Sequence, residues 1–118
     1  MALKVEKLKN CMVVKVEAEK LDITIAPDLK AHLVNISSEG AKNIIIDLSA
    51  ARYCDSSGLS AILVGNRLCK SVGGKLVITG MNEPIRKLLV ISQLDSILNA
   101  AASVDEGIKL LDEVETSK

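Results

Sequence analysis

The sequence predicts an α/β fold, in which a mixed β-sheet begins with an N-terminal antiparallel hairpin and carries helices packed on the sheet. Two observations support this prediction. From residue 27 onward, segments with helical periodicity alternate with short apolar runs, which is the pattern of parallel strands joined by right-handed crossovers. Before that point, residues 12–17 alternate apolar and polar side chains with the period of a strand, and residues 3–9 do so in part.

The first elements follow in order from residue 3. Residues 3–9 and 12–17 form the expected hairpin, with Asn10-Cys11 at its turn. A short third extended piece is expected over 21–25, where apolar and polar residues again alternate.

Helices and strands then alternate. The first helix has Pro27 in its opening turn, where the missing N–H costs nothing, and it ends at Gly40. Ala26 is a poor N-cap, so the sequence specifies the start of this helix only weakly. The remaining expected elements are an almost wholly apolar central strand over 44–48, a helix over roughly 57–72 closed by Gly73-Gly74, a strand over 75–79, a helix capped by Asn82, a short edge strand at 97–98 and a last helix opened by a capping box at 103–106.

The composition is that of one soluble globular domain. The chain has 118 residues, of which 48% are hydrophobic and 25% charged. Fifteen basic residues are matched by fifteen acidic ones, and this balance argues against a nucleic-acid-binding role driven by phosphate neutralisation. The sequence contains no block of like charge suited to an anionic membrane and no apolar run long enough to span one.

The cysteine and aromatic content bears on the cellular compartment and on the kinds of binding surface the protein can form. The three cysteines are odd in number and lack CxxC spacing, and the N-terminus does not resemble a signal peptide, so we expect a reducing cytoplasm. A single Tyr, with no Phe or Trp, argues against base-stacking platforms and cation cages on the surface.

The segment Tyr53-Cys54-Asp55-Ser56-Ser57-Gly58-Leu59 stands where the central strand region leads into the long helix. In open α/β sheets, ligands and partners bind at the edge where the carboxyl ends of the strands lead into helices. Asp and Ser before a helix are ordinary N-caps, so capping alone explains part of the pattern. One side chain suffices for the cap, however, and the second serine is left over.

Catalytic and metal-binding interpretations of this segment find little support. A hydrolase elbow needs G-x-S-x-G, and the single histidine, His32, is interpreted as a surface or half-buried residue of the first helix. Gly58 is not followed by the Lys-Ser or Lys-Thr of a phosphate-binding loop. Asp22, Asp47 and Asp55 form no recognisable metal-ligand spacing, and Cys54 is interpreted as a buried small apolar residue. We therefore predict no enzymatic activity, no cofactor and no metal.

The five residues from Asp55 to Leu59, after a buried strand, resemble the signature of the STAS domain, as found in bacterial anti-sigma factor antagonists. The similarity extends along nearly the whole chain in the same order. The other matching segments are LDI and APDL within 21–29, GGKLVI at 73–78, ISQLD at 91–95 and SVDE at 103–106. The resemblance implies a single domain of STAS fold over residues 1–118.

The resemblance also implies a function. Such proteins bind an anti-sigma factor and so release a sigma factor for transcription. The anti-sigma factor is commonly a serine kinase that uses ATP and phosphorylates the second serine of the motif, here Ser57, and a serine phosphatase restores the active form. By this analogy Ser57 is the phosphorylation site, and the partner-binding residues are Asp22, Asp55, Ser56, Ser57, Gly58, Leu59 and Leu63.

The two leucines in this set come from helical periodicity. At 100° per residue, Ala61, Val64 and Leu68 define the expected buried face of the helix, whereas Leu59 and Leu63 fall on its polar side. They lie one turn apart next to Ser57, which makes them candidates for contact with a partner.

The same resemblance leaves a second interpretation open. STAS domains also occur as scaffolds of stress-signalling complexes and as accessory subunits of lipid-transporting ABC systems. The intact Asp55-Ser56-Ser57-Gly58 motif together with Asp22 favours the antagonist.

Overall fold

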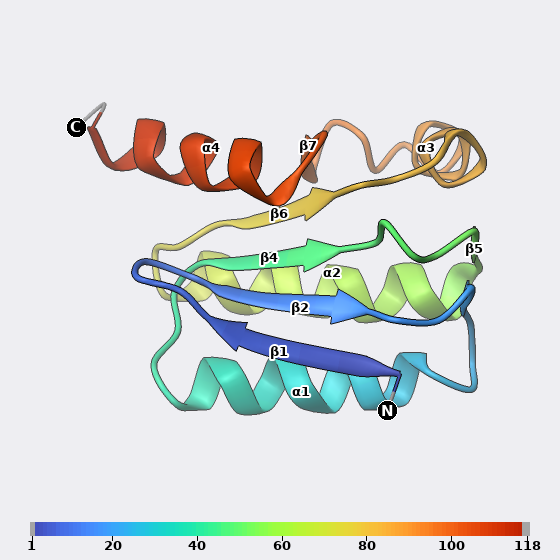
Figure 1. The fold of residues 1–118 in the computed structure, drawn as a ribbon, viewed down its shortest axis with the longest axis horizontal. Coiled ribbons are helices and arrows are strands. Elements are labelled where there is room, and N and C mark those ends of the chain that lie inside the picture. Colours follow the sequence, from blue (N-terminus) through green and yellow to red (C-terminus); the bar gives the residue numbers. More distant parts are fainter. Residues whose placement is uncertain (1, 117–118) are drawn as a thin grey trace.

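The computed structural model describes residues 2–116, with side chains over 2–111, and has a central sheet covered by helices on both faces (Figure 1). The strands are β1 (Leu3–Lys7), β2 (Met12–Val16), β3 (Lys20–Leu21), β4 (Ile44–Asp47), β5 (Tyr53–Cys54), β6 (Leu76–Thr79) and β7 (Asn99–Ala101). The helices are α1 (Ala26–Ser38), α2 (Ser56–Ser71), α3 (Glu83–Ile91) and α4 (Val104–Thr116).

The five-stranded sheet has the order β1-β2-β4-β6-β7. β1 pairs antiparallel with β2, and the three pairs that follow are parallel. Because all the parallel strands run in one direction, their carboxyl ends lie at one edge, where β4 leads toward β5 and α2 (Figure 1). The predicted mixed α/β sheet with an N-terminal hairpin is confirmed.

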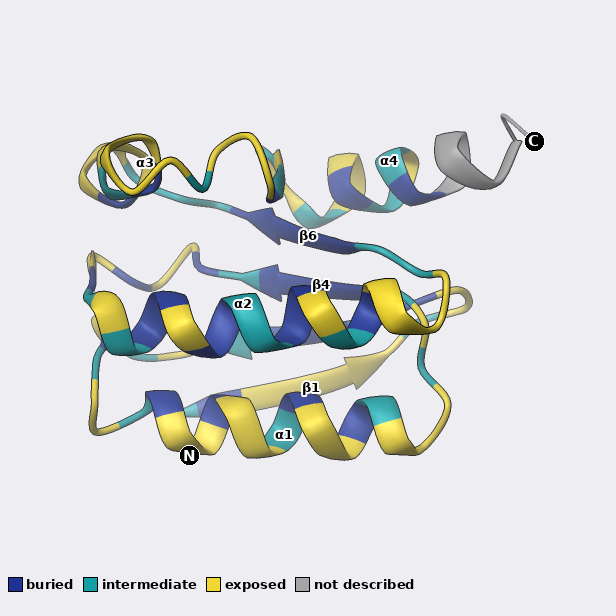
Figure 2. Ribbon diagram, turned by 180° about the vertical axis from the view of Figure 1, so that it is seen from behind, coloured by how far each residue is buried: buried dark blue, intermediate teal, exposed yellow. Residues whose placement is uncertain are grey.

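Both faces of the sheet are buried, and different helices cover them. Residues of β2, β4 and β6 that point toward α1 and α2 form the larger core, which includes Val14, Ile46 and Ile78. The alternate residues, Val13, Ile45 and Val77, pack with Leu111 of α4 on the other face. The view from behind shows the dark, buried stripes of α1 and α2 against the sheet (Figure 2). This burial on both sides explains why the β4 run is apolar throughout.

A second, two-stranded sheet was not predicted. β3 pairs parallel with β5 through Lys20–Tyr53 and Leu21–Cys54. The extended piece expected over 21–25 is wrong beyond Leu21, because the backbone turns at the next residue: the Asp22 carbonyl accepts the N–H groups of Ile25 at 3.0 Å and Ala26 at 2.7 Å. Two-residue strands are too short to produce a period in the sequence.

The expected helix ends are mostly confirmed. α1 starts without a side-chain cap at Ile25. α2 ends with Gly73 at φ +77° and a Gly74 N–H that donates to the Cys69 carbonyl at 2.8 Å, which is a Schellman motif.

The last two elements are confirmed in kind but not fully in position. The edge strand expected at 97–98 lies at Asn99–Ala101, because the chain after α3 first turns back on the carbonyl of Leu94. The Ser103 half of the expected capping box of α4 is present, because the Ser103 Oγ accepts the Glu106 N–H at 3.3 Å. The Glu106 carboxylate reaches one residue further back than expected and accepts the Ala102 N–H at 3.1 Å.

Candidate functional site

The site is the corner between β5 and α2, which we call the serine corner and define as Asp55–Gly58. Asp55 is the N-cap, with extended backbone, and its Oδ1 accepts the Gly58 N–H at 3.1 Å. Ser56 and Ser57 therefore occupy the first two helical positions. Their N–H groups have no acceptor inside a helix that begins there. These N–H groups and the helix dipole favour an anion at this point.

The two serine side chains are accessible to different degrees. Ser56 is exposed and Ser57 is half-buried. Within the described part of the chain, neither hydroxyl takes part in a hydrogen bond, because the cap is supplied by Asp55. The Ser57 hydroxyl is therefore unbonded within the described residues, and its side chain remains partly accessible to solvent.

Gly58 fixes the shape of the corner. A Cβ built on this residue would lie 2.6 Å from the Leu21 carbonyl oxygen and 2.7 Å from the Cys54 Sγ. A backbone oxygen at that distance cannot move aside without shifting β3. Glycine is thus required for the first turn of α2 to press against β3, and Gly58 acts on the site through this packing.

The β3–β5 pairing brings Asp22 to the serine corner. The Asp55 N–H donates to the Leu21 carbonyl at 3.3 Å, so the residue that follows β3, Asp22, comes next to the start of α2. The Asp22 Oδ1 accepts the Thr24 N–H at 3.0 Å and the Thr24 hydroxyl. The Thr24 hydroxyl and N–H, with a smaller contribution from Lys20, hold the pKa of Asp22 below its usual value. The strand pairing therefore brings the backbone of Asp22, one of the sequence-predicted site residues, to the start of α2, while its carboxylate is held by Thr24.

Two exposed apolar side chains beside the corner were missed by sequence analysis. Ile23 is 66% exposed and Tyr53 is 52% exposed, and they lie on the turn after β3 and on β5. Tyr53 was recognisable, because it is the single aromatic residue of the chain and directly precedes the motif. Ile23 was hidden by an apparent strand alternation that placed it on a buried face. Exposed apolar groups next to polar ones are typical of partner-binding surfaces.

The exposure expected for Leu59 is wrong. Leu59 is 6% exposed and belongs to the core, and Leu63 is half-buried and packs against that core. The buried face of α2 is centred near Gly65, whose Cβ position lies 2.8 Å from a Leu76 methyl carbon, and Asn66 is also buried. Hydrophobic periodicity gives no apolar weight to a glycine or an asparagine, so the face expected from Ala61, Val64 and Leu68 is rotated away from the one that is buried.

Cysteine reactivity contributes nothing to the site. The three cysteines are buried and form no disulfide bond with one another. Burial, with the Asp55 charge added, raises the pKa of Cys54 to about 12, and burial raises that of Cys69 to about 11. Neither thiol is an effective nucleophile at neutral pH, and the interpretation of Cys54 as a buried residue is confirmed.

His32 and the acidic residues form no second site. The His32 Nδ1 lies 2.8 Å from the Asp28 carbonyl, one turn earlier in α1, so the imidazole bonds within its own helix. Over the described residues, no group of three His, Cys, Asp or Glu side chains could hold a metal ion. Every helix in residues 2–116 is too short or too polar to cross a membrane.

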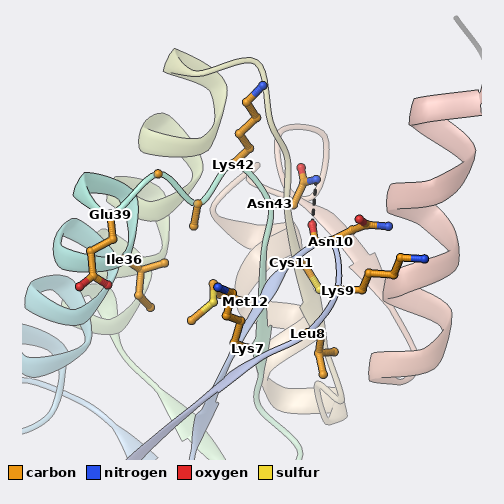
Figure 3. A pocket seen from close by; sticks show the side chains of 12 residues that line it. Lys7, Leu8, Lys9, Asn10, Cys11, Met12, Ile36, Glu39, Lys42 and Asn43 are labelled. Carbon is orange, nitrogen blue, oxygen red and sulfur yellow. Dashed lines mark hydrogen bonds between the residues drawn. The ribbon is translucent and has the colours of Figure 1, made fainter.

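A cavity of about 380 Å³ lies at the opposite end of the sheet, between the β1–β2 turn and the end of α1 (Figure 3). Its walls include Met12 and Ile36, and Asn43 bonds across it to the Asn10 carbonyl at 3.3 Å. Lys9 and Lys42 at its rim extend in different directions (Figure 3). A ligand site needs polar groups that converge, so this cavity offers weaker chemistry than the serine corner.

The chain is similar to known proteins along most of its length. A STAS domain model matches residues 2–107. The anti-sigma-B factor antagonist of Staphylococcus epidermidis is 30% identical over 97 residues, which is 82% of this chain and 85% of that protein. The anti-sigma-B factor antagonist of Bacillus subtilis is 29% identical over 92 residues, or 78% and 84% of the two chains.

Solved structures agree on the fold. The Bacillus cell fate determinant SpoIIAA in its phosphorylated form has a TM-score of 0.72 at 23% identity, over 92% of this chain and 97% of that chain. With a family model that covers far more than half of the sequence, and relatives that match along most of their own length, this protein belongs to the STAS domain family.

Proposed function

We propose that the protein is an anti-sigma factor antagonist whose binding is switched off by phosphorylation of Ser57. Its partner is an anti-sigma factor that is also a serine kinase, and capture of this partner in the cytoplasm releases a sigma factor. A serine phosphatase reverses the modification. The observation that carries the proposal is the free, half-buried Ser57 hydroxyl at the start of α2, beside Asp22 and Asp55. The names of the relatives support the same class of partner.

The serine corner allows a phosphate to be added without damage to the fold. The open N–H groups of the first turn and the positive end of the α2 dipole stabilise an anion on Ser57. The site lies outside the core, so no apolar contact has to break. Phosphorylation is therefore expected to leave the folded structure and its stability almost unchanged.

The same phosphate strongly changes the surface that a partner meets. It adds about −1.5 to −2 charges at pH 7. Asp22 and Asp55 already carry negative charge there, and Thr24 helps to keep Asp22 ionised. A partner that docks over this corner has to desolvate the phosphate or place negative charge against it, and both weaken binding.

The contact surface that we propose combines charge with apolar groups. Asp22, Asp55 and Ser56 supply the polar part, and Ile23 and Tyr53 supply exposed apolar area beside them. Leu63 is half-buried and contributes its accessible portion. Gly58 and Leu59 support the surface from beneath, because both are buried.

The test is intact-mass analysis after incubation with ATP and the anti-sigma factor kinase from the same genome. We expect one added phosphate, mapped by peptide sequencing to Ser57. Ser57→Ala should abolish the modification, and Ser56→Ala is the matched control that should retain it. Phosphorylation of Ser56, or none at any residue, would contradict the proposal.

A further inference from the structure

The strand that leads into the serine corner, β5, is too short to hold its own position. It has two residues and pairs with β3, which also has two. A two-stranded sheet of this size is at best marginally stable alone. The Arg52 and Tyr53 N–H groups donate to the Glu19 carbonyl at 2.7 and 3.0 Å, so these bonds also lie on the β3 side. Within the described residues no further strand pairs with β5, and its other side needs a different support.

The turn that follows β6 supplies part of this support, because it runs along the loop between β4 and β5. The Thr79 carbonyl accepts the Leu48 N–H at 2.8 Å, just past the paired residues of β4 and β6. One residue further, Gly80 lies so close to Ser49 that a Cβ built on the glycine would be 2.9 Å from the Ser49 backbone. The two segments therefore leave the sheet side by side.

Asn82 makes the last of these contacts with its side chain. Its Oδ1 caps α3 by accepting the Ile85 N–H at 3.0 Å, and its Nδ2 donates to the Arg52 carbonyl at 3.1 Å. Arg52 directly precedes β5, and α3 contacts β5 at the same end of the molecule (Figure 1). The backbone of Arg52 is therefore bonded toward β3 through its N–H and toward α3 through its carbonyl.

The path from Asn82 to Ser57 is short and follows the backbone. After Arg52, β5 continues for two residues, and the Asp55 N–H then donates to the Leu21 carbonyl at 3.3 Å. Asp55 is also the N-cap of α2. A shift of β5 away from α3 would move this cap, and the position of Ser57 with it.

We propose that Asn82 is a positioning residue for the serine corner, an inference that rests on the proposed function. Its amide N–H holds β5 toward α3 and so fixes the orientation in which the kinase meets the Ser57 hydroxyl. Without that bond, the corner spends part of its time in other orientations. Apparent affinity falls with the fraction of molecules that are competent to bind. The loss therefore affects binding by the kinase and not phosphoryl transfer in the bound complex.

Two variants remove the donor and keep the cap of α3. Asn82→Asp and Asn82→Ser both retain an oxygen that can accept the Ile85 N–H, because Asp and Ser are good N-caps. Both lose the amide N–H that reaches the Arg52 carbonyl. Since the serine variant is neutral, a comparison of the two separates the lost bond from the added charge.

Asn43 offers a matched control at the opposite end of the sheet. Its Oδ1 accepts the Lys75 N–H at 2.9 Å, and its Nδ2 donates to the Asn10 carbonyl at 3.3 Å. Asn43→Asp therefore loses the same kind of bond and adds the same charge as Asn82→Asp, far from the serine corner.

Amide hydrogen exchange measures the effect on the corner without a partner. We expect the N–H groups of Arg52, Tyr53 and Asp55 to exchange about fivefold faster in both Asn82 variants, as expected when one hydrogen bond is lost. The Ile85 N–H should keep its protection, because the cap of α3 is retained.

Phosphorylation by the anti-sigma factor kinase gives the second readout. In both Asn82 variants the KM for the protein substrate should rise about fivefold while kcat stays within about twofold. Asn43→Asp should keep both constants. A purely structural role would lower the melting temperature without this split between KM and kcat.

The outcomes separate the two proposals. If the unchanged protein is phosphorylated on Ser57 but the Asn82 variants show unchanged exchange or an unchanged KM, the positioning inference is wrong and the proposed function stands. An effect confined to Asn82→Asp, or an equal effect from Asn43→Asp, would also overturn the inference. If the unchanged protein is not phosphorylated on Ser57, the proposed function fails, and the inference fails with it.

Discussion

Two helices of this protein, α2 and α4, begin beside a serine, and the two serines are used in different ways. In α4, Ser103 is the cap: its Oγ accepts the Glu106 N–H at 3.3 Å. In α2, Asp55 is the cap and Ser57 is the second helical residue, with no hydrogen bond to its hydroxyl among the described residues. A capping carboxylate thus leaves the Ser57 hydroxyl available for another role.

The first turns also differ in charge. Asp105 and Glu106 follow Ser103, and the Glu106 carboxylate already binds the Ala102 N–H. The first turn of α2 contains no acidic residue after its cap. The start of α4 therefore already contains the anionic groups that its dipole favours, and the start of α2 has room for one more. The comparison shows that Ser57, which we propose as the phosphoacceptor, differs from Ser103 in having a hydroxyl that its neighbours leave unbonded.

The largest expected effect comes from the glycines of these two turns. Gly58→Ala should reduce the free energy of unfolding by about 3 kcal/mol or more, because the added methyl meets the Leu21 carbonyl at 2.6 Å. Gly107→Ala in α4 meets the Thr79 Cγ2 at 3.2 Å, and this side-chain methyl can adjust, so the loss should be smaller. Urea denaturation measures both. Equal losses would contradict the claim that contact with the Leu21 backbone oxygen makes Gly58 harder to replace than Gly107.

The next largest effect is expected on binding, when a carboxylate replaces the serine of either turn. Ser57→Asp should weaken anti-sigma factor binding by about 100-fold, or about 2.7 kcal/mol, through like charge at the corner. Ser103→Asp keeps a good N-cap at α4 and should leave binding unchanged. Calorimetric titration gives both affinities. Similar losses from the two variants would mean that net charge, and not its position, controls docking.

Removal of the two hydroxyls should affect stability in the reverse order, with the larger loss at Ser103. Ser103→Ala should lower the free energy of unfolding by about 1 kcal/mol, because a cap is lost. Ser57→Ala should change it by less than about 0.5 kcal/mol, as expected for a hydroxyl without a structural partner. The difference is measured by chemical denaturation at pH 7. A larger loss for Ser57→Ala would show that its hydroxyl is structural.

The smallest expected effect concerns pH. The pKa of Asp22 is lowered in the folded state, so its ionised form stabilises the protein above the unfolded pKa, and this contribution is lost as the pH falls through the folded pKa. Asp22→Asn should therefore flatten the decline in melting temperature below about pH 4. Thr24→Val, which removes the hydroxyl donor, should do the same. An unchanged pH profile in both variants would show that the Thr24 bond to ionised Asp22 does not contribute to stability.

Strong local signals made much of the fold predictable. The order of strands and helices, the Asn82 cap, the glycine closure of α2 and the capping box of α4 each depend on a few adjacent residues. The pairing of Asp22 with Asp55 was suggested by resemblance, but the β3–β5 pairing that produces it was not predicted. Strands of two residues leave no periodic pattern.

The remaining errors arise from packing. Leu59 is buried because α2 turns its glycine-containing face toward Leu76 and Leu33. A hydrophobicity pattern does not register that a glycine allows the helix to approach its neighbours closely. Ile23 is exposed because the backbone turns at Asp22, which breaks the alternation. Tertiary contacts decide the burial of Leu59, whereas a local turn decides the exposure of Ile23, and both residues lie at or beside the candidate site.

The most direct test uses the protein phosphorylated on Ser57 to completion, with the Ser57→Ala protein as reference. Differential scanning calorimetry and titration with the anti-sigma factor are performed on the same sample. We predict a melting temperature close to that of the unmodified protein and an affinity reduced by about 100-fold or more. A phosphorylated protein that binds as tightly as before, or that loses its fold, would contradict the account.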